Sequence, residues 1–131
     1  MFTEDDFRRI ALGMKGAIES AHMGHPDFRA NGRIFATLHP DRAWGMVKLT
    51  PEQQQEFMRA SPSAFKPEAG AWGRQGCTAV RLDAVDEETA GEALTLAWRN
   101  SAAKAAQRPK SNTRGSRTGR PRAKGERSPR R

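Results

Sequence analysis

The fold of this chain is decided by residues 22–49, HMGHPDFRANGRIFATLHPDRAWGMVKL. This stretch predicts three strands joined by two tight turns, at residues 28–30, 33–38 and 43–49. Asn31 and Gly32 form the first turn. An Asn-Gly pair between extended segments favours a type I′ hairpin, because both central residues of that turn need φ > 0. Residues 39–42, His-Pro-Asp-Arg, supply the second turn, since proline presets φ and aspartate bonds to nearby backbone.

The third of these strands has two unlike faces. Two alternating sets of residues make it up: Gly45, Val47 and Leu49, and Trp44, Met46 and Lys48. Successive side chains of a strand point to opposite faces, so we expect the first set to face a core and the second to face away from it. An antiparallel sheet with one apolar face needs helices to cover that face. The sequence therefore predicts an α/β fold of the α+β kind.

Local capping signals predict where two helices begin. Thr3 and Asp6 have the spacing of a capping box, in which each side chain accepts a hydrogen bond from the other residue's backbone N–H. Thr50 and Gln53 repeat that spacing. Pro51 occupies the first helical position, where its missing N–H is not needed. We expect the second helix to end near residue 60.

The second half of the chain predicts one strand and one helix. Residues 77–83 alternate so that Val80 and Leu82 face the core, whereas the Gly- and Pro-containing residues 63–76 are typical of a loop. Asp86 caps the last helix, which fades near Ala103. With a further strand at residues 17–22, the expected order is helix, four strands, helix, strand, helix.

The order and spacing of three segments resemble the MmcQ/YjbR family of small bacterial proteins. These segments are GHPDFRANGRIFATL from Gly24, WGMVKLTPEQQQEF from Trp44 and WGRQGCTAVRL from Trp72. The resemblance covers about residues 3–100. It implies a frataxin-like (CyaY-like) sandwich, in which an antiparallel sheet packs against the terminal helices. The family is commonly labelled DNA-binding, and the resemblance brings no catalytic residues.

Charge divides the chain into two parts. Residues 1–103 hold 12 Lys and Arg and 14 Asp and Glu, which gives a net charge of −2. Residues 104–131 hold 11 Lys and Arg and one Glu, which gives +10, and alanine is their only apolar residue type. Such a segment cannot bury enough apolar surface to offset its chain entropy. We therefore expect a folded domain at residues 1–103 and a disordered basic tail at residues 104–131, beyond the family's usual end.

Composition indicates the cytoplasm. Cys77 is the single cysteine and cannot form an intramolecular disulfide, which fits a reducing compartment. The first residues, Met-Phe-Thr-Glu-Asp-Asp, are acidic and lack the apolar region of a signal peptide. No apolar run approaches the ~18 residues that span a bilayer, so we expect no membrane association.

Motifs of catalysis are missing from the sequence. No phosphate-binding glycine loop precedes a lysine, and there is neither a nucleophile elbow nor an HExxH motif. We therefore expect no enzymatic activity and no cofactor. His22, His25 and Asp27, with His39 as a further ligand, suggest a metal site. We favour the alternative that these residues form hydrogen bonds around the turn, and expect no metal.

Within the domain, the face that carries Trp44 and Lys48 is the candidate binding surface. Trp72 and Arg74, from the glycine-flanked loop, could fold across this face. Aromatic side chains interleaved with Lys and Arg suit base stacking and phosphate contact. The alternative is that Trp44 and Trp72 form a small second core under the loop, because large aromatic side chains are usually buried.

The basic tail gives the most direct functional signal. Its candidate nucleic-acid-binding residues are Arg114, Arg117, Arg120, Arg122 and Lys124. The sequence Gly-Arg-Pro-Arg ending at Arg122 resembles the core of an AT-hook, although Thr118 stands where that motif has arginine. We predict a DNA-binding protein of low sequence specificity. The alternatives are a solubilising tail, and a protein- or small-molecule-binding module that uses the Trp44/Trp72 face.

Overall fold

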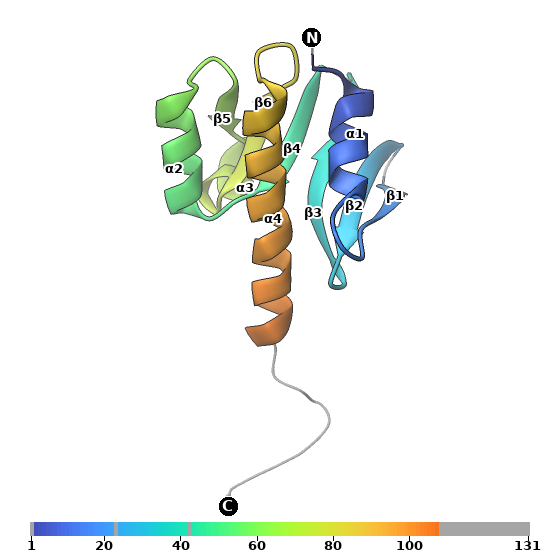
Figure 1. Ribbon diagram of the computed structural model, residues 1–131. Helices are drawn as coiled ribbons and strands as arrows, with labels where there is room; N and C mark the ends of the chain where they lie inside the picture. Colours follow the sequence, from blue (N-terminus) through green and yellow to red (C-terminus); the bar gives the residue numbers. More distant parts are fainter. Residues whose placement is uncertain (1, 23, 42, 108–131) are drawn as a thin grey trace, which may run out of the picture.

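The computed structural model describes residues 2–22, 24–41 and 43–107 (Figure 1). The strands form one six-stranded antiparallel sheet in the order β1-β2-β3-β4-β6-β5. In chain order the elements are α1 (Glu4–Leu12), β1 (Ile18–His22), β2 (His25–Ala30), β3 (Arg33–Leu38), β4 (Trp44–Lys48), α2 (Pro51–Ala60), β5 (Phe65–Pro67), α3 (Gly70–Arg74), β6 (Cys77–Arg81) and α4 (Glu87–Gln107). An antiparallel sheet packed against helices confirms the predicted fold class.

The hairpin between β2 and β3 turns at Asn31 and Gly32, as predicted. The φ angle is 58° at Asn31 and 74° at Gly32, and a type I′ turn requires positive values at both positions. Glycine adopts such an angle without steric cost, and asparagine tolerates it better than most residues. Ala30 pairs with Arg33 across the turn, so these two residues set the register of the central strands.

A β-bulge follows in β3, where the sequence predicts a regular strand. Phe28 pairs with Ala36 but Arg29 pairs with Ile34, which leaves Phe35 as an extra residue. Both Phe35 and Ala36 are fully buried in the core. The bulge therefore lets two consecutive residues of one strand join the core, which plain alternation does not allow.

Strand β4 alternates as predicted. Gly45 and Val47 are buried, whereas the residues on either side of them are partly exposed. A Cβ at Gly45 would lie 2.8 Å from Cε2 of Phe7, so the missing side chain leaves room for the ring of α1. The centroids of the Phe7 and Phe28 rings are 5.9 Å apart. Helix α1 therefore packs on the sheet through one aromatic residue that meets both β2 and β4.

The predicted caps are present at all three long helices. Thr3 and Asp6 form a capping box at α1, and Thr50 and Gln53 form another at α2. At α4 the Oδ1 atom of Asp86 accepts a hydrogen bond from the backbone N–H of Thr89 at 2.7 Å. Each cap satisfies backbone N–H groups that have no partner within the helix.

Three helices form a layer on one face of the sheet. Figure 1 shows α1, α4 and α2 in front of the strands, with α4 between the other two. Helix α4 contacts β2, β3, β4 and α1. Its fully or almost fully buried apolar residues are mostly small: Ala90, Ala93, Leu94 and Ala97. Small side chains let the helix axis lie close to the sheet, and the core is formed between the two layers.

The loop predicted at residues 63–76 is wrong in two places, because β5 and α3 lie within it. Strand β5 is an edge strand of three residues, with Phe65 opposite Val80 of β6. Helix α3 has five residues, and Gly70 and Gly73 are two of them. Neither element is long enough to show a periodic pattern, so both depend on contacts with β6 and its neighbours.

Helix α4 is longer than predicted, since it continues past Ala103 to Gln107. Alanine, lysine and glutamine, which make up the added turn, are good helix formers. The rest of the predicted tail, residues 108–131, lies outside the described residues. In the part of the chain that the structure describes, no helix has the length and apolar character needed to cross a membrane. The likeness to the frataxin sandwich stays a prediction.

Candidate functional site

The structure brings two of the predicted site residues together and separates a third from them. Lys48 and Trp72 line one hollow near the C-terminal part of α4. Trp44 has other neighbours: the Nζ atom of Lys66 lies 4.4 Å from its ring centroid, and the guanidinium carbon of Arg81 lies at 5.8 Å. Arg74 is exposed in the last turn of α3.

Trp44 and Trp72 do not form a second core. The side chain of Trp72 is 63% exposed. Trp44 is partly buried, and the two cations beside its ring are placed for cation–π contact. The ring of Trp44 therefore already has partners within this chain, whereas the indole of Trp72 is open to a ligand.

We call the space beside Trp72 the cationic hollow. Its volume is about 630 Å³, which is within the range of small-molecule sites. It lies where the start of β3, the end of β4, the start of α2, helix α3 and the last turns of α4 meet. The residues used below that line it are Arg33, Lys48, Trp72, Cys77, Asn100 and Lys104.

Positive charge dominates the cationic hollow. Arg33, Lys48 and Lys104 line it, and no Asp or Glu does so. Within the described residues, none of these three cations forms an ion pair. The Nε atom of Arg33 is buried and has no hydrogen-bond acceptor among those residues. Converging cations without carboxylates raise the local potential and favour an anion.

Side-chain hydrogen bonds fix the walls of the cationic hollow. The Nδ2 atom of Asn100 donates to the carbonyl oxygen of Lys48 at 3.1 Å and to Oε1 of Gln53 at 2.9 Å. These bonds join α4 to β4 and α2. The Nδ2 atom of Asn31 donates to Oγ of Ser101 at 3.1 Å, which joins the β2–β3 turn to α4. The four elements are therefore tied together around the hollow.

Helix α3, which carries Trp72, lies against the end of β4. Gly76, which follows α3, has φ 110°, and a Cβ at this position would lie 2.0 Å from the carbonyl oxygen of Leu49. Only glycine therefore allows this approach. The buried Gln54 of α2 donates from Nε2 to the carbonyl oxygen of Gly73 at 3.0 Å. Trp72 is thus exposed on a backbone that is held from two sides.

Cys77 lines the cationic hollow without making it a nucleophilic site. Burial raises the pKa of the Cys77 thiol; the charge of Lys48 opposes this effect and the charge of Glu68 adds to it. A thiol with a raised pKa is protonated at neutral pH, and the protonated form is a poor nucleophile.

Two of the residues considered as metal ligands have other partners. Asp27 is fully buried, and its carboxylate oxygens accept from Nε of Arg29 at 2.8 Å and from Nη2 at 3.1 Å. The Nε2 atom of His39 lies 2.9 Å from Oε2 of Glu68. His25 is partly buried on β2. Across residues 2–22, 24–41 and 43–107, no group of three His, Cys, Asp or Glu could hold a metal ion.

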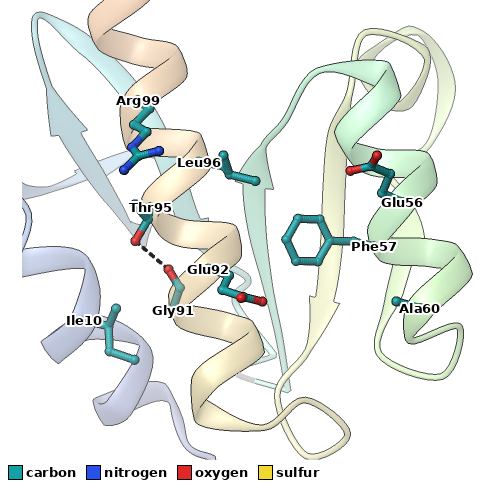
Figure 2. Close-up of a pocket in the computed structure, with 9 residues that line it drawn as sticks. All are labelled: Ile10, Glu56, Phe57, Ala60, Gly91, Glu92, Thr95, Leu96 and Arg99. Carbon is teal, nitrogen blue, oxygen red and sulfur yellow. Dashed lines mark hydrogen bonds between the residues drawn. The ribbon is translucent and has the colours of Figure 1, made fainter.

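A second cavity, of about 670 Å³, lies between the helices of the layer. Figure 2 shows Phe57 of α2 and Leu96 of α4 pointing toward one another across it, with Ile10 of α1 at its side. Glu56, Glu92 and Arg99 contribute two carboxylates and one guanidinium to its lining. This mixed charge on an apolar groove is suited to a different ligand from the one that the cationic hollow favours.

Sequence reasoning missed Arg33 as a site residue and counted Lys104 only within the tail. The available signal for Arg33 was its place directly after the Asn31-Gly32 turn, at the same end of the sheet as Lys48. The predicted tail residues lie outside the described part of the chain: Arg114, Arg117, Arg120, Arg122 and Lys124.

The fold and the cationic hollow define a small α+β protein with one helical layer and a basic site at one end of its sheet. The chain belongs to the YjbR family, whose model matches residues 12–100, and this confirms the resemblance to MmcQ/YjbR proteins.

The chain is also similar to a solved structure, the crystal structure of Deinococcus radiodurans protein DR2400, described with the domain DUF419. The two share 23% sequence identity with a TM-score of 0.64, and the match covers 82% of this chain and 81% of that chain. This likeness shows the fold alone. A comparison with curated proteins finds no match.

Proposed function

We propose that this chain is a DNA-associated protein of low sequence specificity, with its affinity supplied mainly by the basic C-terminal residues 104–131. The observation that carries the proposal is the division of charge, with −2 on residues 1–103 and +10 on residues 104–131. Cations that neutralise phosphates release counterions from DNA, and this term is independent of base sequence. The proposed role includes no catalysis and no cofactor.

The position of the cationic hollow supports this proposal. Lys104 is the first cation of the basic segment and also lines the hollow. Lys48 and Arg33 lie beside it on the sheet. Two cations of residues 1–103 therefore line the same hollow as the first cation of the basic segment, so one polyanion could contact both.

A protein- or small-molecule-binding module is the second candidate function. The open indole of Trp72 favours it, because large exposed aromatic residues are frequent at binding sites. Since Trp44 is engaged by Lys66 and Arg81, this candidate rests on Trp72 rather than on a joint Trp44/Trp72 face.

The test compares the full chain with a variant, here called tail-neutral, in which five of the eleven cations of residues 104–131 are neutralised: Arg114→Gln, Arg117→Gln, Arg120→Gln, Arg122→Gln and Lys124→Gln. Labelled duplex DNA is titrated at several salt concentrations. With roughly 5–8 phosphates neutralised at about −0.9 each, the slope of log K against log salt should be about −5 to −7 for the full chain. For the tail-neutral variant the slope should be smaller in magnitude by about 3–5, since this variant lacks five cations.

A matched control keeps the charge and changes only the chemistry, with Arg→Lys at the same four arginine positions. It should retain the salt slope on random duplex DNA. A selective loss of affinity for AT-rich duplex would show that the arginines enter the minor groove as in an AT-hook. If the tail-neutral variant binds duplex as tightly as the full chain, the proposal fails. If the full chain binds no duplex, the second candidate function takes its place.

A further inference from the structure

We propose that the cationic hollow binds a phosphate group that carries a nucleobase, with the base stacked on Trp72. This unit is common to a free nucleotide and to a nucleic-acid strand. The inference goes beyond the proposed function, because the site lies in the folded domain and needs none of the residues after Gln107.

The positive charge of the hollow favours the phosphate group of the ligand. Arg33, Lys48 and Lys104 line the hollow with no Asp or Glu beside them in its lining, and none forms an ion pair with a described residue. A cationic ligand such as a polyamine would be repelled by these three cations. A phosphate would balance these charges, and it offers several acceptor oxygens to donors that come from different elements.

The guanidinium of Arg33 favours an anion that presents two oxygens, as a phosphate does. Its Nε atom is buried without an acceptor in the described part of the chain, and a buried donor without an acceptor is costly. The Nε and Nη groups of arginine form a fork that matches two oxygens of a phosphate or carboxylate. A phosphate in the hollow would supply acceptor oxygens to this guanidinium.

The exposed indole of Trp72 favours the nucleobase of the ligand. Its indole is 63% exposed although α3 is fixed by Gly76 and by the hydrogen bond from Gln54. A flat aromatic surface beside cations is what base stacking and phosphate contact require together. The volume of about 630 Å³ has room for a base, a sugar and a phosphate.

The geometry also implies a preference among nucleic acids. The bases of an intact duplex stack on one another and present only their edges, so they cannot lie on Trp72. A mononucleotide or a single strand has a free base face. We therefore expect the hollow to prefer single-stranded to double-stranded DNA, and we expect no such preference from the basic tail.

The test measures the binding of adenosine 5′-monophosphate, adenosine and inorganic phosphate to the full chain and to each variant by isothermal titration calorimetry. The monophosphate should bind at least tenfold more tightly than either part alone. Trp72→Ala should weaken its binding about tenfold or more, since stacking is worth about that much per base. Lys48→Gln and Lys104→Gln should each weaken it by roughly two- to fivefold, as for an exposed ion pair.

Matched controls separate the hollow from the tail and from general charge. Arg59→Gln removes an exposed cation on α2 outside the hollow and should leave the binding unchanged. The tail-neutral variant should also bind the monophosphate as the full chain does, so that this proposal and the proposed function can fail separately. Thermal melting of each variant shows whether it is folded. Lys104→Gln changes an exposed helix position, so it still tests the site if another variant fails to fold.

Two further probes distinguish the sources of the ligand. A 5′-phosphorylated oligodeoxyadenosine strand and the blunt duplex that it forms with its complement are compared at high salt, where the tail contributes least. Tighter binding of the strand than of the monophosphate indicates nucleic acid, and the reverse indicates a free nucleotide; both support the site. Equal affinity for adenosine and its monophosphate, an unchanged affinity in Trp72→Ala, or no binding of any probe would each overturn the proposal.

Discussion

The Nε2 atom of Gln54 lies 3.0 Å from the carbonyl oxygen of Gly73, and this hydrogen bond joins α2 to α3. The same amide reaches the carbonyl oxygen of Cys77 at 3.1 Å and Oγ1 of Thr78 at 3.2 Å. Oγ1 of Thr78 in turn donates to the carbonyl oxygen of Gly76 at 2.8 Å. Gln54 and Thr78 are only 4% and 0% exposed, so water cannot replace a lost member of this network.

Gln54→Ala should therefore lower the free energy of unfolding by about 1–2 kcal/mol, because it removes the side-chain hydrogen bonds that join α2 to α3 and β6, while the carbonyl groups of Gly73 and Cys77 keep the backbone donors of Gly76 and Glu68. Urea unfolding measures the change. Gln55→Ala is the matched control, since Gln55 is the exposed neighbour on the same helix, and it should stay within about 0.5 kcal/mol of the wild type. Similar losses for both variants would mean that the network contributes nothing.

Two glycine substitutions should have opposite signs. Gly32→Ala places a Cβ at φ 74° in the hairpin turn and should destabilise the protein by about 1–2 kcal/mol. Gly91→Ala lies within α4, where a Cβ meets nothing within 4 Å, and should stabilise the protein by about 0.5–1 kcal/mol. Melting temperatures of the two variants decide this. An unchanged or raised melting temperature of Gly32→Ala would contradict the type I′ turn, and a lowered one of Gly91→Ala would contradict the open position on α4.

Trp98 should contribute through both its ring and its N–H. Its Nε1 atom donates to the carbonyl oxygen of Lys15 at 2.9 Å, and its partly buried ring packs against the core. Trp98→Phe removes the hydrogen bond and should cost about 1 kcal/mol. Trp98→Ala should cost about 3 kcal/mol, the lower end of the range for large aromatic residues, because the ring is not fully buried. Urea unfolding measures both losses of free energy. Equal losses for the two variants would show that the packing of the ring contributes nothing.

Asp86 should make the free energy of unfolding depend on pH. Hydrogen bonds from the backbone and side chain of Thr89 hold the pKa of the Asp86 carboxyl below its usual range. In the unfolded chain the pKa returns to about 3.9, so the unfolded state binds the proton first as the pH falls. The stabilisation by Asp86 is therefore complete above about pH 5, and it is lost as the pH falls through the lower folded value.

Asp86→Ser keeps a helix cap but removes this titration. The difference in unfolding free energy between the wild type and Asp86→Ser should thus shrink steadily as the pH is lowered from 5. Asp6, whose pKa is also lowered, is present in both proteins and cancels from the difference. Parallel pH profiles for the two proteins would show that Asp86 does not act through its charge.

Features that depend on neighbouring residues in the chain could be predicted from the sequence. The turn at Asn31 and Gly32 needs only two positive φ angles, and the caps at Thr3 and Thr50 need only a partner three residues away. Strand β5 could not be predicted in this way, because Phe65 is held by Val80 on another strand. Three residues do not form a strand without such a partner.

The candidate site was predicted less well than the fold, for a related reason. Lys48 and Trp72 were expected on one surface, but the cationic hollow also needs Arg33 and Lys104, which come from elements far apart in the sequence. Trp44 was grouped with Trp72 because both are large aromatic residues. The structure pairs Trp44 with Lys66 instead, and only the order of β4, β6 and β5 in the sheet explains that contact.

The edge strand β5 has a consequence for how molecules of this protein meet one another. Its outward-facing backbone has no donor to offer, because Pro67 lacks an N–H and the N–H of Phe65 is given to the carbonyl oxygen of Ser61 at 3.2 Å. A strand from a second molecule cannot complete a ladder there. Strands of other molecules therefore cannot extend the sheet at β5. The opposite edge, β1, is where such pairing could begin.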